Sequence, residues 1–196
     1  RWCDVGYQFL VDRFGRIWQG RSGSISQPVI GGHAAGFNTG SVGVGLMGQF
    51  EPGASPAYAT PSAVMVDSTA RLLAWKLDLH GLDPHGTVRV TSGGSTRYPS
   101  GTSVTLPVVN HHRQTSTTLC PGQLVIDRMP AMRNAIASHM GSGPSDPPPP
   151  DPGDWAPFSD AESLVWRDLQ AAYGVGDVAS LVFRDQHAGE RGRVPG

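Results

Sequence analysis

The stretch GYQFLVDRFGRIWQGR, residues 6–21, contains two short runs of residues that favour β-structure. The first run is Phe9 to Val11 and the second is Ile17 to Gln19. Between them, Asp12-Arg13-Phe14-Gly15 provides a turn, with glycine at a position that needs a positive φ. This pattern predicts a β-hairpin near the start of the chain.

Further elements follow the hairpin. SVGVGLMGQF, residues 41–50, is a short and nearly continuous apolar run, which predicts a buried strand. Residues 60–80 carry apolar side chains at helical spacing, with Thr60 as the expected N-cap, Pro61 in the first turn and Gly81 as the glycine that ends the helix. The region from 41 to 81 therefore predicts a strand followed by a long helix.

The next two elements complete one domain. Residues 101–109 contain a short strand-like run, and residues 123–140 indicate one or two helical segments interrupted at Pro130. Strands and helices thus alternate over residues 1–140. That alternation predicts an α/β domain whose central sheet is covered by helices.

The remainder of the chain has a different composition. Residues 141–154, GSGPSDPPPPDPGD, include four consecutive prolines and predict an extended linker. Residues 155–196 contain one amphipathic helical pattern at 160–174, with Asp160 as its expected cap. About forty residues bury little core, so we expect this tail to be part of a helical module.

Composition restricts the classes of function. The 196 residues carry a net charge of −1 with a pI of about 6.7, which argues against nucleic-acid binding because that needs a basic face. No apolar run reaches the length of a bilayer span, and no signal-peptide pattern is visible. The chain begins at Arg1, so we expect an internal piece of a longer protein. Whether Cys3 and Cys120 pair in a disulfide is left open.

Residues 110–122, NHHRQTSTTLCPG, form a polar loop that contains potentially reactive or metal-binding side chains. His112 and Cys120 are eight residues apart, and imidazole and thiolate are good ligands for zinc. Two such residues do not define a metal site. The same thiol could instead be a nucleophile activated by the helix that follows it, or an inert buried cysteine.

Three motifs in a fixed order extend the argument: WCDVGYQFLVDRFGRIWQGR, then GGHAAGFNTGSVGVGLMG, then HHRQTSTTLCPG. Together they resemble the zinc-dependent N-acetylmuramoyl-L-alanine amidases, which share their fold with phage lysozyme-type amidases and animal peptidoglycan recognition proteins. The resemblance covers about residues 1–136. It implies a central mixed β-sheet flanked by helices, and a hydrolase that cuts the amide between N-acetylmuramic acid and L-alanine in peptidoglycan.

The resemblance also implies roles for particular residues. His112 and Cys120 match two of the family's three zinc ligands, and Tyr7 matches its active-site tyrosine. Thr118 matches a Lys or Thr that helps to polarise the scissile carbonyl. Without the resemblance, Tyr7 is a half-buried strand tyrosine and Thr118 an ordinary loop residue.

His33 and Asn38 match positions in the family's substrate groove, and a role in closing a loop is an equally good interpretation of both. The family's first zinc histidine belongs to a strand that precedes Arg1. We therefore expect this chain to lack the first strand, to bind Zn²⁺ weakly and to hydrolyse little. His111 is expected to be exposed rather than to replace the missing ligand.

Two other functions stay open at this point. The chain could be a peptidoglycan-binding domain without activity, although the resemblance implies that binding-only members lose the cysteine that is Cys120 here. It could also be a cysteine hydrolase with Cys120 as nucleophile and His112 as base. We expect a monomer that acts on peptidoglycan, and hence a secreted or wall-associated location.

Overall fold

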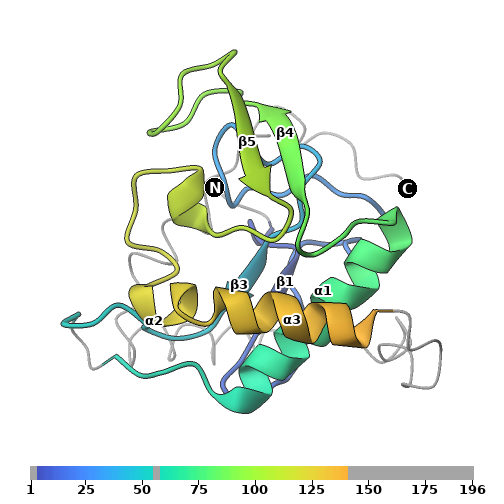
Figure 1. Cartoon of the computed structure of the whole chain (residues 1–196), viewed down its shortest axis with the longest axis vertical. Coiled ribbons are helices and arrows are strands. Elements are labelled where there is room, and N and C mark those ends of the chain that lie inside the picture. Colours follow the sequence, from blue (N-terminus) through green and yellow to red (C-terminus); the bar gives the residue numbers. More distant parts are fainter. Residues whose placement is uncertain (1–3, 55–57, 141–196) are drawn as a thin grey trace.

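The computed structural model describes residues 4–54 and 58–140. Within them the order of elements is β1, β2, β3, α1, β4, β5, a 3₁₀ turn, α2 and α3. The expected linker at 141–154, the expected helical module at 155–196 and the pairing of Cys3 lie outside the described residues. The predicted α/β class with a central mixed sheet is confirmed (Figure 1).

The predicted hairpin is present with the predicted strands. β1 (Phe9–Val11) pairs antiparallel with β2 (Ile17–Gln19), and Leu10 lies opposite Trp18. Gly15 has a φ of 81°, which glycine adopts without strain. The carboxylate of Asp12 accepts hydrogen bonds from the backbone N–H groups of Phe14 (2.8 Å) and Arg16 (3.0 Å), so one buried side chain stabilises the turn.

β3 (Val44–Leu46) lies on the other side of β1 and runs parallel to it, with Phe9 opposite Val44. The sheet order is therefore β2-β1-β3, with one antiparallel and one parallel pair. The strand expected in residues 41–50 is confirmed, but its three residues are half-buried rather than fully buried. The connection from β1 to β3 passes through β2, and its last part, residues 20–43, carries His33.

α1 (Ala63–His80) begins two residues later than Thr60 predicted. Ser62 is the N-cap: its hydroxyl accepts a hydrogen bond from the backbone N–H of Met65 (3.2 Å) and donates one to the carbonyl of Arg13 (2.6 Å). Ser62 thus caps the helix and ties it to the hairpin turn. The predicted end of the helix is confirmed, because Gly81 has a left-handed conformation with φ 59°.

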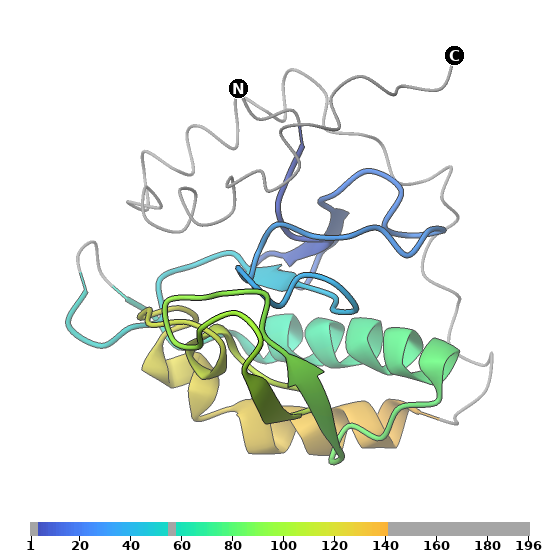
Figure 2. The same cartoon turned by 90° about the horizontal axis from the view of Figure 1, so that it is seen from above.

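The helices are stacked in layers. Figure 2 shows α1 between the central sheet and α3 (Met129–His139), so both helices lie on one side of that sheet. One core cluster joins Phe9 and Val11 of β1 to Met65 of α1. A second core cluster joins α1 to α3 through these buried residues: Ala70, Ala74, Leu77, Met129, Met132 and Ile136.

The short helix α2 (Gln123–Ile126) precedes α3, so residues 123–140 do form two helical segments. The interruption was predicted at Pro130, but it lies at residues 127–128. Pro130 is in the first turn of α3, where no intrahelical bond requires its missing N–H.

A second sheet consists of β4 (Thr87–Thr91) and β5 (Ser103–Pro107), paired antiparallel with Val90 opposite Val104. The strand expected within 101–109 is β5, whereas β4 was not predicted. The loop between the two strands contacts the loop that contains the cysteine. The backbone N–H of Thr117 donates to the hydroxyl of Thr96 at 2.8 Å.

Candidate functional site

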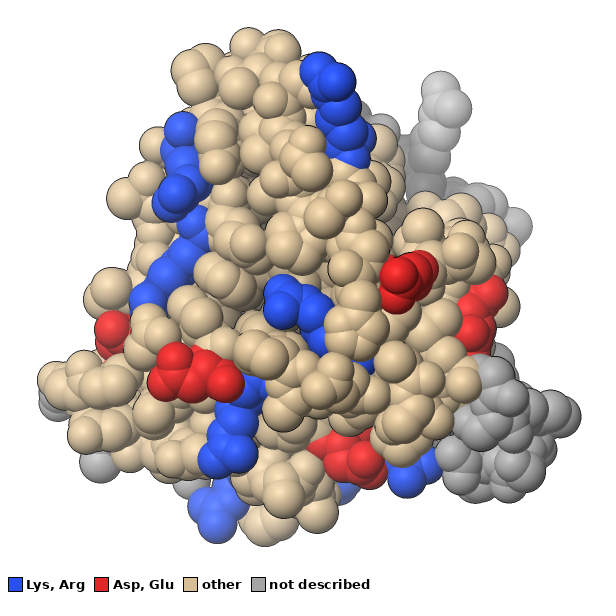
Figure 3. Space-filling view, in the orientation of Figure 1, with Lys and Arg blue, Asp and Glu red and all other residues tan. Residues whose placement is uncertain are grey.

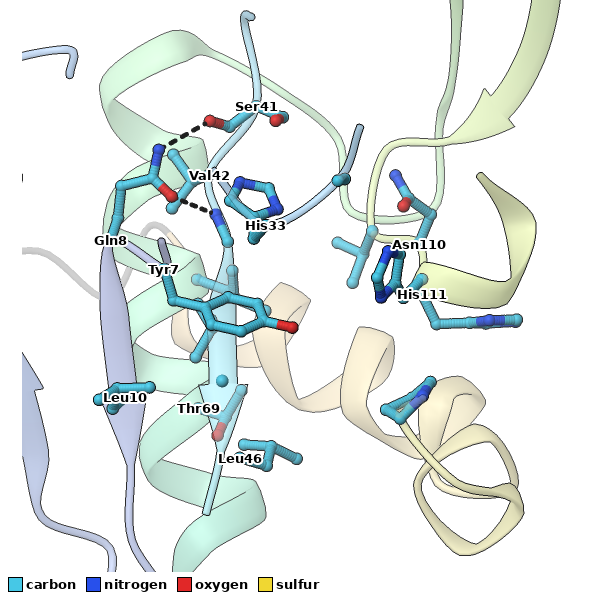
Figure 4. A pocket seen from close by; sticks show the side chains of 18 of the residues that line it. Tyr7, Gln8, Leu10, His33, Ser41, Val42, Leu46, Thr69, Asn110 and His111 are labelled. Carbon is cyan, nitrogen blue, oxygen red and sulfur yellow. Dashed lines mark hydrogen bonds between the residues drawn. The ribbon is translucent and has the colours of Figure 1, made fainter. Parts of the chain in front are cut away.

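One cavity is lined by five of the six predicted site residues, which come from separate parts of the chain. Tyr7 precedes β1, and His33 lies in the crossover before β3. His112, Thr118 and Cys120 lie in the loop between β5 and α2. Figure 4 shows the hydroxyl of Tyr7 pointing across the cavity towards the segment that contains Asn110 and His111. The fold therefore brings together residues more than one hundred positions apart in sequence.

Tyr7 and Cys120 are neighbours in the cavity. The Tyr7 ring is buried, and its hydroxyl is close enough to the thiol of Cys120 for each group to affect the pKa of the other. Burial raises the pKa of Tyr7 well above its ordinary value, and the neighbouring Cys120 raises it further. Burial also raises the pKa of Cys120. In the metal-free protein both groups are therefore protonated at neutral pH.

His33 forms the wall of the cavity next to Tyr7. The two rings are stacked, with centroids 5.5 Å apart and an interplanar angle of 14°. A Cβ on Gly43 would lie 2.3 Å from Cδ2 of His33, so only glycine at position 43 leaves room for this ring. Burial, and then the charges of His112 and Arg21, lower the pKa of His33 to about 4. The imidazole is thus neutral at pH 7.

His112 is the first residue of the 3₁₀ turn His112–Gln114. Its Nδ1 is buried and has no hydrogen-bond partner within residues 4–54 and 58–140, and the same is true of the Nε2 of His33. Burial lowers the pKa of His112, which favours the neutral imidazole. Buried polar atoms normally have partners, so a sealed and unpartnered imidazole nitrogen is the kind of atom that a bound metal or substrate satisfies.

Thr118 and Cys120 belong to one tight turn. The hydroxyl of Thr118 accepts a hydrogen bond from the backbone N–H of Cys120 at 3.1 Å. A hydroxyl that accepts in this way keeps its own proton to donate. Cys120 is half-buried, and within residues 4–54 and 58–140 it forms no disulfide.

The donors fit zinc in kind, because an imidazole nitrogen and a thiol sulfur are both typical zinc ligands. Within the described part of the chain, no three His, Cys, Asp or Glu residues are grouped so that they could hold a metal ion. His111 is half-buried rather than exposed as expected, and its buried Nδ1 has no hydrogen-bond partner within the described residues. The described residues alone therefore do not supply a group of three donors.

Asn38 does not line this cavity. It is buried, and its side-chain oxygen accepts hydrogen bonds from the backbone N–H groups of His33 (2.9 Å) and Ala34 (2.7 Å). This geometry supports the loop-closing interpretation of Asn38, because its side chain fixes the turn that carries His33. Contact between Asn38 and substrate stays a prediction.

Sequence reasoning missed three residues that hold the site in place. The amide of Gln8, which is almost fully buried, is bonded to three backbone groups around the His33 crossover, two of them drawn in Figure 4. Glu51 and Arg113 form an ion pair beside the turn that carries Cys120. The only signal in the sequence was a glutamine inside an apolar strand-like run, since the partners of Glu51 and Arg113 are far away along the chain.

The face of the molecule seen in Figure 3 is not dominated by one charge. Figure 3 shows Lys and Arg side chains on the same face as Asp and Glu, with wide uncharged areas between them. Of the helices in the described residues, none combines the length and the apolar character needed to cross a bilayer.

Several known proteins are similar to this chain. The endolysin of Klebsiella phage KP32 is 40% identical over 62 residues, which cover 31% of this chain and 38% of the endolysin. Peptidoglycan-recognition protein SC2 of Drosophila melanogaster is 25% identical over 121 residues, or 62% of this chain and 49% of that protein. The chain thus spans less than half the length of either relative.

Among solved structures, N-acetylmuramoyl-L-alanine amidase LysC from Clostridium intestinale aligns with a TM-score of 0.45 and 18% identity, over 66% of this chain and 64% of that one. The sequence pattern described as N-acetylmuramoyl-L-alanine amidase matches residues 1–123. This match covers well over half of the 196 residues. The chain therefore belongs to the N-acetylmuramoyl-L-alanine amidase family.

Proposed function

We propose that this chain carries a zinc-dependent hydrolase site that cleaves the amide bond between N-acetylmuramic acid and L-alanine in bacterial peptidoglycan. One observation carries the proposal: the neighbouring Tyr7 and Cys120 line one cavity with His112, whose buried Nδ1 has no hydrogen-bond partner among the described residues. Membership of the amidase family supports the choice of bond. The phage endolysins and peptidoglycan-recognition proteins among its relatives support peptidoglycan as the partner.

His112 and Cys120 would hold the metal, and a further protein ligand would come from outside the described residues. When bound with an open coordination position, Zn²⁺ lowers the pKa of water to about 7 and polarises a carbonyl. An imidazole must be neutral to bind a metal, and the burial that lowers the pKa of His112 favours that form.

Tyr7 and Thr118 would act on the reacting atoms. The phenol of Tyr7 lies in the cavity and would hold the attacking water by a hydrogen bond. The hydroxyl of Thr118, whose oxygen already accepts from the N–H of Cys120, would donate its proton towards the oxyanion that develops on the scissile carbonyl. A positioned acid–base group of this kind contributes about 10²–10⁴-fold to a rate.

His33 would form the wall of the groove along which the substrate lies. Its ring is fixed by stacking on Tyr7 and by the close approach of Gly43. A neutral, buried imidazole with an unpartnered Nε2 can accept or donate one hydrogen bond to a sugar or peptide group. In this arrangement His33 orients the substrate against Tyr7.

The geometry gives less support to a thiol nucleophile. Burial raises the pKa of the Cys120 thiol, and its neighbour Tyr7 is a phenol, whereas a thiol nucleophile needs a base to take its proton. We propose that the protein acts on cell-wall peptidoglycan as a monomer. We further propose a secreted or wall-associated location, because that is where this substrate lies.

The test compares clearing of a purified peptidoglycan suspension by the full chain, before and after removal of metal with EDTA and after return of Zn²⁺. Because the chain is expected to bind Zn²⁺ weakly and to hydrolyse little, the proposal expects slow clearing that EDTA abolishes and excess Zn²⁺ restores. Clearing that survives EDTA but is lost on alkylation of Cys120 would favour the thiol nucleophile instead. Tight binding of the suspension without clearing at any Zn²⁺ concentration would favour a non-catalytic binding domain.

A further inference from the structure

Two charged side chains, Glu51 and Arg113, hold the turn that contains Cys120 through hydrogen bonds. Cys120 lies three residues before α2, in a segment where the N–H of Gly122 bonds to the carbonyl of Leu119 at 2.8 Å. Cys120 stays at its place in the cavity only if the backbone on both sides of it is held. Arg113 and Glu51 provide that restraint.

Arg113 contacts the segment on both sides of the cysteine. Its Nε and Nη2 donate to the carbonyl of Leu119, at 3.1 Å and 2.6 Å, and its Nη1 donates to the side-chain oxygen of Gln123 at 3.1 Å. Leu119 is the residue before Cys120, and Gln123 is the first residue of α2. One rigid guanidinium thereby fixes the distance across residues 119–123.

Glu51 completes the restraint from a different part of the chain. Its Oε2 accepts from the Nη2 of Arg113 and from the backbone N–H of Gln123, the latter at 2.8 Å. The carboxylate therefore satisfies an open N–H at the start of α2 while pairing with the guanidinium. Nearby, a Cβ on Gly122 would lie 2.4 Å from the carbonyl carbon of Phe50, so the two backbones are in close contact.

The Glu51–Arg113 ion pair is shielded enough from solvent to stabilise the turn. The side chains of Glu51 and Arg113 are 23% and 22% exposed, whereas the two members of the pair Asp67–Arg71 on α1 are each about half exposed. Charge-assisted hydrogen bonds away from solvent are stronger than those of a surface pair, which commonly adds little. Loss of Glu51 would leave both Arg113 and the Gln123 N–H without this acceptor.

We infer that Glu51 and Arg113 act as positioning residues that hold the Cys120 turn in its place at the cavity. The metal-binding consequence of this inference rests on the proposed function, which assigns Cys120 as a zinc ligand. The inference about the turn itself rests only on the contacts above.

The test uses the full chain with Glu51→Ala and Glu51→Gln, beside Asp67→Ala as a matched control. Asp67 also pairs with an arginine, Arg71 at 2.9 Å, and in addition with His139 of α3 at 3.0 Å, but with no residue of the segment 117–126 in the described structure. Hydrogen exchange measured by mass spectrometry on metal-free protein reports opening of residues 117–126. We expect exchange in that segment to rise roughly 10-fold or more in Glu51→Ala, because a partly buried N–H and a charged guanidinium lose their acceptor.

Glu51→Gln keeps an oxygen that can accept from the Gln123 N–H but carries no charge, so its effect should be intermediate. It also serves if Glu51→Ala does not fold. Asp67→Ala should leave exchange in residues 117–126 unchanged. Unchanged exchange in both Glu51 variants would overturn the inference.

A second measurement is the affinity for Co²⁺, monitored through the absorption of the thiolate–cobalt bond. A purely structural role of Glu51 would leave this affinity unchanged. We expect Co²⁺ affinity to fall about 10-fold or more in Glu51→Ala and to be retained in Asp67→Ala, as for other residues that orient a ligand. Faster exchange with unchanged Co²⁺ affinity would refute the positioning role. If the wild type itself binds no Co²⁺, the proposed function fails, and hydrogen exchange alone then upholds or overturns the restraint on the turn.

Discussion

Replacing Gln8 by methionine should destabilise the fold and loosen the part of the site that contains His33. Gln8 is 2% exposed, and its Nε2 donates to the carbonyls of Val29 (3.0 Å) and Ser41 (3.2 Å). Its Oε1 accepts from the N–H of Gly43 at 2.7 Å. The side chain therefore joins the residue before β1 to backbone groups on both sides of His33.

The size of the effect follows from what methionine leaves unpaired. The Gly43 N–H is buried, and an unsatisfied buried donor costs about 1–3 kcal/mol. The carbonyls of Val29 and Ser41 are in half-buried residues, so water recovers part of their loss. Methionine has nearly the same shape, so little packing is lost, and we expect a total of about 2–4 kcal/mol.

Urea unfolding followed by tryptophan fluorescence measures this change. The midpoint should fall while the slope of the free energy with urea stays constant, since the same surface is exposed on unfolding. Gln27→Met is the matched control, because Gln27 is exposed, and it should change the free energy of unfolding by less than about 0.5 kcal/mol. A loss in Gln8→Met as small as that of the control would refute the reasoning.

Three further predictions concern other parts of the structure. Tyr7→Phe should lower the rate of peptidoglycan hydrolysis by roughly 10²–10⁴-fold and leave the zinc content unchanged by elemental analysis; loss of the folded state would instead indicate a packing role. Ile136→Ala should cost about 2–5 kcal/mol in urea unfolding, because Ile136 is 0% exposed between α1 and α3, and a loss below about 1 kcal/mol would contradict that packing. Burial alone would raise the pKa of Asp12, but hydrogen bonds from Arg16, Phe14 and Trp18 outweigh it and lower the pKa below its ordinary value of 3.8. The stability that the Asp12 carboxylate contributes is therefore present above that value and lost as the pH falls through the folded pKa. The free energy of unfolding of the wild type minus that of Asp12→Asn should shrink below about pH 4. A difference that stays constant down to pH 2 would refute this.

Local patterns accounted for much of the fold. The hairpin strands at 9–11 and 17–19 and the glycine at the end of α1 were predicted, because turn chemistry and capping depend on residues close in sequence. β4 was missed although Val88 and Val90 alternate with polar residues, since a five-residue run beside a Pro-His-Gly turn is a weak signal. The parallel register of β1 and β3 depends on a crossover of more than twenty residues, which no local pattern specifies.

The site divides in the same way. His112 and Cys120 share a loop, so their spacing alone made them candidates. The proximity of Tyr7 to Cys120, the stacking of His33 on Tyr7 and the bonds of Glu51 join segments distant in sequence, and only the fold brings them together. Asn38 shows the limit of a motif match, because its side chain bonds to the His33 turn and does not line the cavity.

The most direct test of the central claim is mass spectrometry of purified peptidoglycan after digestion by the full chain in the presence of Zn²⁺. The account predicts free stem peptides that begin with L-alanine, together with glycan strands that have lost them. Cys120→Ser should release at least about 10-fold less, because it removes a proposed metal ligand. Equal release by Cys120→Ser, or products cut at glycosidic or peptide bonds with the N-acetylmuramic acid–L-alanine amide intact, would contradict the account.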